Sequence, residues 1–442
     1  MKIDRFSFIV LIDLIAAVTA VAFHSMIDLQ TAVWIAIATI AITIYSIFTI
    51  YDHRLSFSSV LQLYTIATQF GLVIPYVLFG RESIEYSDYT LRFMNSEYLV
   101  TALLMGNLAV IVYEFVRRMT LRNQRVKHSL PIIAEDDERT NNKMYVAAMA
   151  MILIVIGFFA FHIVTGGMRL FGSYEEFRSG SVATSSIYSY ILILFYVGTL
   201  YLAASGPIGK RKTGWVLWGV MVVIFAMNGN KGEFLYALLA VLGLKGIQGQ
   251  KITWRMLLLI GALLFAVIPS ITFLRSIGIA GNLSNGKVDF FASFAEMGMQ
   301  IRTSVHALEE LDSGRISYLW GMSYIQPIIN MLIPTSKKVA TMELRNIFYG
   351  YGFNQVIESY LNFDYIGVAM FFGCVSCMLV RAETKQRSNL SLAWIGTITC
   401  VLINASRNYF AFVPGQIVIV TIIYWVINMV KINFKVRVGK ND

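Results

Sequence analysis

Several cations and two candidate bases are concentrated in and around one polar interval of this chain. The interval 276–364 contains Arg302, His306, Arg345 and Glu358, and Arg275 directly precedes it. A guanidinium presents a planar fork that matches phosphate oxygens and keeps its charge at every relevant pH. A carboxylate or an imidazole can take the proton of an attacking hydroxyl. These residue types predict an anionic, phosphate-bearing substrate and a proton abstraction beside it.

Four features are candidates to form this site. The first is residues 228–233, the tip of a predicted hairpin between the apolar runs 213–229 and 231–247. The others are an amphipathic helix within 290–311, the pair Arg275 and Arg345, and the segment 358–362 opposite the turn 407–409. Glu358 is the first candidate base and His306 the second. The binding candidates are Lys231, Arg275, Arg302, Arg345, Arg407, Tyr360, Asn408 and Glu296. Other interpretations stay open, because Lys231 can snorkel, Arg275 can anchor the interface, and Glu358 can simply pair with an arginine.

The segment 290–311 has the spacing of a helix that lies on a bilayer. Its apolar positions are Phe290, Phe294, Met297, Ile301, Val305 and Leu308, and its polar stripe is Gly298, Arg302, His306 and Glu309. Both sets recur at helical intervals. Such a helix would bury the first face in lipid and present the second to a lipid headgroup. The alternative is a solvated face stabilised by pairs of charges one turn apart.

The composition requires a membrane to position these residues. The chain is 57% apolar and 14% charged, with a mean hydropathy of +0.64, whereas soluble proteins carry about 25% charged residues. The net charge of +10 resides mainly in short loops, which argues against nucleic acid as a partner. Nucleotide-binding glycine loops and a zinc motif are absent from the sequence, so no cofactor or metal is expected. Cys374 and Cys377 lie in an apolar run and are expected to pack rather than bind metal.

Twelve apolar segments approach the length needed to cross a hydrocarbon core of about 30 Å. The segments are 6–23, 31–51, 58–79, 98–115, 144–165, 187–204, 213–229, 231–247, 256–274, 365–380, 390–405 and 413–430. An uncleaved first helix fits better than a signal peptide, because further spans follow. Asp13 within it is a functional candidate that faces water or a polar partner helix. The expected fold is therefore an all-α, polytopic membrane protein, with residues 1–442 as a single membrane domain.

The basic residues orient these segments. With the N-terminus inside, 23 of the 36 Lys and Arg fall on the cytoplasmic side, and 6 fall outside it beyond the long loop. This bias predicts that both termini are cytoplasmic and that 276–364 is a long external (periplasmic) loop. The segment 117–143 is then a flexible cytoplasmic connector of mixed charge. Cations on the external side, where there is no ATP, suit a lipid-anchored substrate with its own leaving group, such as a lipid diphosphate sugar.

The chain resembles the bacterial oligosaccharide repeat-unit polymerases, the Wzy-type O-antigen polysaccharide polymerases. The resembling stretches are, in order, Asn228-Gly-Asn-Lys-Gly-Glu-Phe234, Phe294-Ala-Glu-Met-Gly298, Gly321-Met-Ser-Tyr-Ile325 before Ile333-Pro334, and Glu358-Ser-Tyr-Leu-Asn-Phe363 before Gly367. Together with the spans and the late external loop, they extend the resemblance over essentially the whole chain. The basic residue at the hairpin tip is often arginine in this family, and Lys231 lacks its bidentate grip.

The resemblance implies a GT-C-like helical glycosyltransferase in the bacterial cytoplasmic membrane. Such an enzyme joins repeat units carried on undecaprenyl diphosphate, with inversion and without a metal. The implied partners are donor and acceptor lipid-linked oligosaccharides and membrane lipids, with a chain-length regulator protein as a further candidate. Two rivals stay open: an O-antigen ligase, which hands the glycan to a lipid core, and a lipid-oligosaccharide flippase or other transporter. The polymer class, whether O-antigen, capsule or exopolysaccharide, also stays open.

Overall fold

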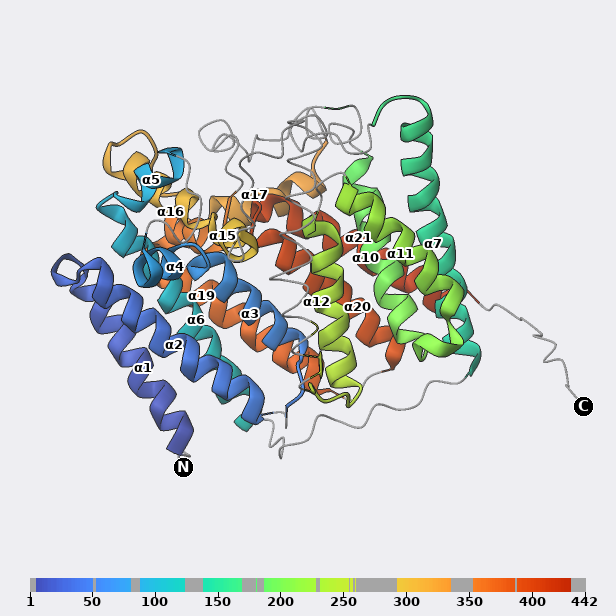
Figure 1. Ribbon diagram of the computed structural model, residues 1–442, viewed down its shortest axis with the longest axis horizontal. Coiled ribbons are helices and arrows are strands. Elements are labelled where there is room, and N and C mark those ends of the chain that lie inside the picture. The colour runs from blue at the N-terminus through green and yellow to red at the C-terminus, as the bar shows by residue number, and fades with distance from the viewer. Residues whose placement is uncertain are drawn as a thin grey trace, which may run out of the picture. The chain divides into compact units, whose positions relative to one another are not determined.

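The described part of the chain is helical. The computed structural model describes residues 5–50, 53–80, 88–123, 138–168, 180, 187–227, 231–253, 255–256, 259, 292–334, 353–385 and 388–430, and these form helices and connecting turns (Figure 1). The chain divides into two compact units. Unit 1 comprises Met1–Pro131, Lys245–Lys385 and Thr399–Gly415, and unit 2 comprises Ile132–Leu244, Gln386–Ile398 and Gln416–Asp442.

Unit 1 holds the N-terminal helices and the elements of the long loop. Its elements are α1 (Arg5–Ala22), η1 (His24–Met26), α2 (Leu29–Ile50), α3 (Phe57–Phe70), α4 (Val73–Phe79), α5 (Asp88–Met94), α6 (Tyr98–Asn123), α15 (Ala292–Gly298), α16 (Ile301–Asp312), α17 (Met322–Leu332), α19 (Gln355–Thr384) and η6 (Phe410–Phe412). Unit 2 contains α7 (Glu138–Val164), α10 (Tyr188–Ala204), η3 (Ile208–Lys210), α11 (Lys212–Met227) and most of α12 (Lys231–Ile247). The helices α20 (Asn389–Ala405) and α21 (Val413–Met429) are divided between the units.

The protein is a multi-pass membrane protein. Among the described residues, the helices long and apolar enough to cross a membrane are Leu29–Ile50, Tyr98–Asn123, Glu138–Val164, Gln355–Thr384 and Phe410–Met429. Shorter apolar helices are Phe6–Ala22, Tyr188–Ala204, Lys212–Met227 and Asn389–Ala405. Each predicted segment thus has a helical counterpart except 256–274, most of which lies outside the described residues. The predicted third span is a pair, α3 and α4, bent by 54°.

The bend between α3 and α4 accommodates another helix of unit 1. Gly298, at the end of α15, lies so close to the break that an added Cβ would stand 2.1 Å from the backbone nitrogen of Leu72. Only a residue without a side chain permits this approach. The loop helix α15 is therefore seated directly on the interrupted span.

Helix α6 is the core of unit 1. It packs against α1, α2, α3, α16 and α19 (Figure 1). Consecutive positions such as Leu103, Leu104 and Met105 are all buried, so the helix is enclosed around its circumference. The outer helices differ, because α1 exposes Phe8 and Ile12. On the inner side of α1, the Thr39 hydroxyl donates to Asp13 Oδ1 at 3.1 Å, so this intramembrane carboxylate faces a polar position on α2.

The predicted helix 290–311 differs from the observed elements. The described residues form α15 and α16, separated at 299–300. Ile301, Val305 and Leu308 are buried in the protein, and α16 packs against α6. The expectation that this apolar face enters lipid is wrong for α16, because the neighbouring helices of unit 1 already cover it.

Candidate active site

Glu358 lies on a short helical segment that is set apart from the span following it. The Asn354 side chain caps its start by accepting from the Ile357 N–H at 2.9 Å. The helix is interrupted at Phe363 (φ −149°, ψ 35°) and Asp364 (φ 56°, ψ −151°). Asp364 Oδ1 then accepts from the Tyr365 N–H at 2.7 Å, at the start of the second part. The result is a segment of two turns, 355–362, before the long part of α19.

The Glu358 carboxylate is buried and held in place from two sides. The residue is 1% exposed. Its Oε2 accepts from the Phe410 N–H at 2.9 Å and from Gln355 Nε2 at 3.1 Å. Gln355 Nε2 also donates to the Asn408 carbonyl at 3.0 Å. Removing a carboxylate from water is costly, and these donors offset part of that cost. The turn after α20 therefore orients the carboxylate.

Helix α17 contacts the same segment. Asn362 Nδ2 donates to Ser323 Oγ at 2.7 Å and to the Glu358 carbonyl at 2.8 Å. The hydroxyls of Tyr324 and Ser359 are 2.7 Å apart. Burial, followed by the charge of Glu358, raises the pKa of Tyr324 well above its ordinary value. Ser359 gives its own proton to the Gln355 carbonyl at 2.6 Å, so the phenol is the donor in its contact with Ser359.

The junction of α15 and α16 is joined to this segment by amide groups. Asn354 Nδ2 donates to the Gln300 carbonyl at 2.9 Å and to Ser304 Oγ at 2.8 Å. With the Gln300 amide oriented to satisfy its neighbours, its nitrogen donates to the Phe353 carbonyl at 3.0 Å and its oxygen accepts from Arg407 Nε at 3.2 Å. Two of the four predicted features thus meet in unit 1: the region of α15 and α16, and the segment 358–362 with the turn 407–409 opposite it.

A cavity of about 20 Å³ lies behind Gln355. It is lined by Leu61, Thr65, Gln355, Phe371, Phe372, Val375, Leu402, Ala405, Ser406, Phe410 and Val413. This volume suits about one water molecule. A sugar or a diphosphate does not fit, so the cavity is not the substrate pocket.

The other predicted residues of unit 1 have separate surroundings. His306 Nδ1 lies 3.7 Å from both Glu309 Oε2 and Glu310 Oε1, and its ring packs edge-on against Phe93. Arg302 Nε donates to the Met299 carbonyl at 3.2 Å. The remaining three are placed as follows: Tyr360 is buried beside Tyr318 and Tyr365, Asn408 Nδ2 donates to Asn404, and Glu296 is half-buried on α15. His306 is therefore part of an acidic cluster on α16, distinct from the donors around Glu358.

Three predicted cations have no described side chain near Glu358. Arg275 and Arg345 lie outside the described residues. Lys231 begins α12, but its side chain is not among those described, and nearly all of that helix belongs to unit 2. In that unit, the hydroxyl of Tyr196 donates to Glu233, two residues after Lys231.

The sequence did not identify several residues that hold the site together. Gln355 and Gln300 are uncharged and belong to no motif, and Ser323 and Tyr324 lie in the resembling stretch 321–325 but were not predicted as site residues. Asn354 had a local signal, because an asparagine before an apolar periodic run is a typical helix N-cap. The contacts of the others join elements far apart in the chain, and a single sequence does not reveal such pairs.

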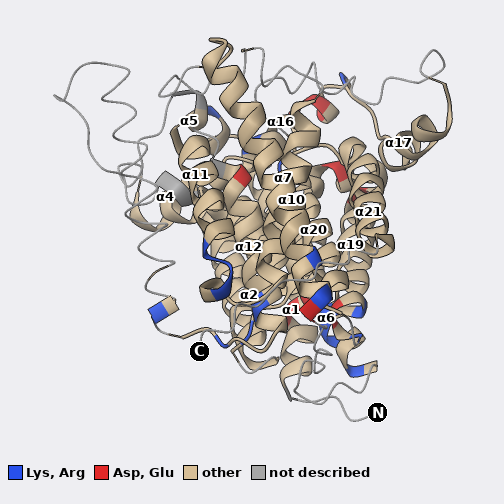
Figure 2. Ribbon diagram, turned by 90° about the vertical axis from the view of Figure 1, so that its right-hand side faces the viewer, with Lys and Arg blue, Asp and Glu red and all other residues tan. Residues whose placement is uncertain are grey.

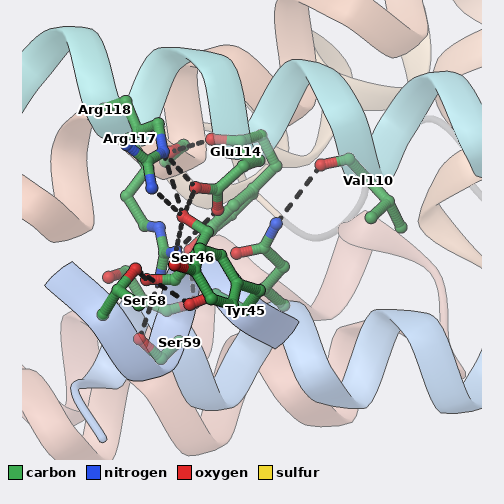
Figure 3. A network of polar contacts seen from close by, with 12 residues as sticks. Tyr45, Ser46, Ser58, Ser59, Val110, Glu114, Arg117 and Arg118 are labelled. Carbon is green, nitrogen blue, oxygen red and sulfur yellow. Dashed lines mark hydrogen bonds and ion pairs between the residues drawn. The ribbon is translucent and has the colours of Figure 1, made fainter. Parts of the chain in front are cut away.

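A second buried polar cluster, also absent from the sequence prediction, lies in the C-terminal parts of α6 and α19. Figure 3 shows the contacts around Glu114 and Arg117. Glu114 Oε2 and Arg117 Nη2 are 2.7 Å apart, and both side chains are fully buried. Glu114 also accepts from Ser46 and from Arg118. Arg117 Nη1 donates to Ser59 Oγ at 2.9 Å. Glu383 accepts from the Ser58 hydroxyl at 2.6 Å, which adds the end of α19. The cluster joins α2, α3, α6 and α19.

Comparison with known proteins agrees with the resemblance. The family model described as O-antigen polysaccharide polymerase Wzy matches residues 5–437. Protein CapE of Staphylococcus aureus is 27% identical over 392 residues, which are 86% of this chain and 86% of that protein. No solved structure matches the chain.

Proposed function

Because the chain belongs to the O-antigen polysaccharide polymerase Wzy family, we propose that it polymerises oligosaccharide repeat units carried on undecaprenyl diphosphate. Polymerases of this family are glycosyltransferases, and the apolar helices make this one a multi-pass membrane protein. We place the reaction on the external face of the bacterial cytoplasmic membrane. The proposal includes twelve spans and a GT-C-like arrangement.

One observation carries the assignment of the base, namely the buried carboxylate of Glu358 with its two fixed donors. A hydroxyl oxygen of the acceptor sugar attacks the anomeric carbon of the donor chain and forms the new C–O bond. The bond from that carbon to the diphosphate breaks, and its electron pair leaves with the diphosphate. The hydroxyl proton passes to the Glu358 carboxylate. Attack opposite the leaving group inverts the anomeric centre, and no metal is needed.

Cations near the site would stabilise the departing diphosphate. Arg407 lies in the turn whose next residues orient Glu358 through Gln355 and the Phe410 N–H. Arg302 is two residues before Ser304 on α16, and Ser304 accepts from Asn354. Charge that develops on a leaving group is stabilised best by donors already in place. Lys231, Arg275 and Arg345 are proposed as further ligands of the diphosphate, with Tyr360, Asn408 and Glu296 contacting sugar.

The distribution of charge supports the proposed orientation. In unit 1, α6 ends with Arg117, Arg118 and Arg122, and α19 ends near Arg381 and Lys385 (Figure 2). Glu358 is at the opposite end of α19. By the positive-inside rule we propose that the basic ends, both termini and the connector 117–143 are cytoplasmic, although 117–123 and 138–143 belong to α6 and α7 rather than to a flexible segment. Single cysteines at Ser313 and at Arg122 test this in intact cells. An impermeant maleimide should label only Ser313→Cys from outside, and the reverse pattern would contradict the orientation.

Replacing Glu358 tests the chemistry. Glu358→Gln keeps the size and the hydrogen-bond acceptor but removes the base. We expect the variant to make no polymer in a deletion strain, while protein level and single lipid-linked units stay normal. Glu97→Gln, at an exposed carboxylate of the same unit, is the matched control and should make polymer of normal length. Long-chain polymer from the Glu358→Gln variant, measured by glycan electrophoresis, would exclude this role.

A further inference from the structure

Helix α17 has two unlike faces. Gln326 and Pro327 are buried, and Tyr324 contacts Ser359 in the segment that bears Glu358. The other face consists of Met322, Ile325, Ile328, Ile329 and Leu332, all of which are exposed. Ile325 is 52% exposed, Ile328 50% and Leu332 82%. These residues recur every three or four positions and therefore form one continuous stripe.

This stripe is not suited to water. The sequence contains no charged residue from 316 to 336, so the stripe has no ionic rim along α17 itself. A contiguous exposed apolar patch marks a membrane or a protein contact. Helix α16 shows the opposite arrangement, because it buries Ile301 and Val305 and exposes Asp312 at its end. The two helices of the loop thus differ in what their apolar faces contact.

The stripe continues onto the side of α19 that faces lipid. Gly321, just before α17, lies so close to Phe363 that an added Cβ would be 2.9 Å from its ring and 3.8 Å from Ile325 Cδ1. Phe363 is partly exposed at the interruption of α19, and Ile366 in the next turn is 69% exposed. Ile366 lies in the first turn of the long part of α19, which belongs to one of the candidate membrane spans. The exposed surfaces of Ile325, Phe363 and Ile366 therefore follow one another.

Aromatic residues lie at the edge of this exposed apolar surface. Trp320 is 70% exposed, and its ring lies 5.9 Å from that of Tyr318. The Tyr360 and Tyr365 rings lie 5.1 Å apart beside the interruption. Tryptophan and tyrosine are enriched where the headgroups meet the hydrocarbon. The charged side chain of Asp364 is exposed at the same place.

We propose that α17 lies in the surface of the bilayer, with its stripe among the acyl chains of one leaflet. The occupant of the stripe is membrane lipid, argued from its continuity with the lipid-facing side of α19. The opposite face of the same helix then holds Ser323 and Tyr324 against the Glu358 segment, so the carboxylate is fixed near the headgroup level. If the proposed function is correct, this is the depth at which a lipid-linked diphosphate presents its sugar.

Spin labelling of the full chain tests the location of α17. Cys374 and Cys377 are replaced by alanine to leave only the buried Cys400. Single cysteines at Ile325, Ile328 and Leu332 are labelled with a nitroxide in vesicles of phosphatidylethanolamine and phosphatidylglycerol. Ile366→Cys serves as the lipid-facing reference and Ser313→Cys as the aqueous one. We expect all three α17 labels to collide more with dissolved oxygen than with a water-soluble nickel chelate, as at Ile366.

Two results of the spin-label experiment would overturn the proposal. One is chelate accessibility at the three positions equal to that of Ser313. The other is dipolar broadening that disappears when unlabelled protein is added, because it would show that a second copy covers the stripe. Native Trp320 provides a measurement without labels. Lipids brominated near the headgroup should quench the protein fluorescence, and Trp320→Phe should remove that part of the quenching; an unchanged quenched fraction counts against the proposal.

The experiments on the location of α17 and the experiment on the role of Glu358 test two independent claims. The accessibility and quenching measurements need no catalysis, so polymer from Glu358→Gln would remove the proposed base and leave the lipid contact intact. The variant Ile328→Glu tests whether polymerisation depends on the lipid contact of α17, because a charge in the stripe opposes insertion of this helix. We expect at least a tenfold loss of polymer from Ile328→Glu with folded protein still present. Normal polymer from this variant would contradict the coupling of the lipid contact to the site.

Discussion

Gln355 connects the candidate base to a distant turn. One amide nitrogen donates both to the Glu358 carboxylate and to the Asn408 carbonyl. The Phe410 N–H supplies the second donor to the same carboxylate oxygen. These two donors act on the same oxygen and together fix the orientation of the carboxylate. Gln355 is thus a positioning residue, because it acts through Glu358.

Replacing Gln355 should reduce polymerisation more than stability. In Gln355→Ala the carboxylate loses one donor, and a misplacement of this kind costs up to about a hundredfold in rate. We expect a loss of roughly ten- to a hundredfold in polymer formed per folded protein, measured with purified protein in vesicles.

Gln62→Ala is the matched control for this prediction. Gln62 is also a buried glutamine, whose Nε2 donates to the Val110 carbonyl at 3.3 Å in the core of unit 1. Losing a buried hydrogen bond costs about 1–3 kcal/mol of stability in either variant. We expect Gln62→Ala to keep its rate per folded protein. Equal rates from the two variants would show that Gln355 has only a structural role.

Helix α19 depends on close contact between its two parts. Asp364 has a positive φ of 56°, and it begins the second part. A non-glycine residue in this region is strained, and the surrounding packing has to maintain it. Gly367 supplies that packing, because an added Cβ would lie 2.1 Å from the Ser359 carbonyl oxygen. Ser359 in turn meets Tyr324, so the contact extends to α17.

Gly367→Ala should therefore separate the two parts of α19. Alanine in a helix is more favourable than glycine by about 1 kcal/mol, but forcing a methyl group into a closed contact costs about 1–3 kcal/mol. The steric cost dominates at this distance, and we expect a lower melting temperature and little polymer. Gly373→Ala is the control, because its added Cβ would meet Val116 and Val112 at 3.5 and 3.7 Å, which is ordinary contact. Equal tolerance of the two substitutions would contradict the proposed packing.

The arrangement of unit 1 depends on polar contacts at both ends of α19. Glu358 lies near its start and Glu383 near its end. The Glu114–Arg117 cluster (Figure 3) joins four helices, and both side chains of this pair are fully buried. A buried ion pair gains little over an apolar pair, but losing one partner leaves a charge without compensation. The cluster therefore specifies which helices meet rather than adding much net stability.

Glu114→Gln should destabilise unit 1 strongly. The change leaves Arg117 and Arg118 without their carboxylate, and the expected loss is about 3–5 kcal/mol. Thermal unfolding of the purified protein in detergent measures it. The control is Arg92→Ala, which removes an exposed pair whose Nη2 and Oε2 atoms are 3.8 Å apart. Such a pair contributes about 0–1 kcal/mol. Similar shifts in the two variants would indicate that the cluster is open to solvent.

Local patterns in the sequence were sufficient to predict the helical membrane class and most helix positions. The length and apolarity of a run such as 144–165 are local properties, and α7 follows them. Glu358 and Arg407 could be named as candidates because their charges are unusual beside apolar segments. The donors to Glu358 could not be named, because the Phe410 N–H is 52 positions away in the chain and carries no distinguishing side chain.

The tertiary structure was needed to distinguish two helices of similar pattern. Both α16 and α17 have an apolar stripe, and the sequence alone favoured lipid contact for the region that contains α16. The fold places α6 against the stripe of α16 and leaves that of α17 exposed. Periodicity shows that a face is apolar, since this depends only on spacing along one helix. What covers the face depends on which helices pack together, and that is a property of the folded chain.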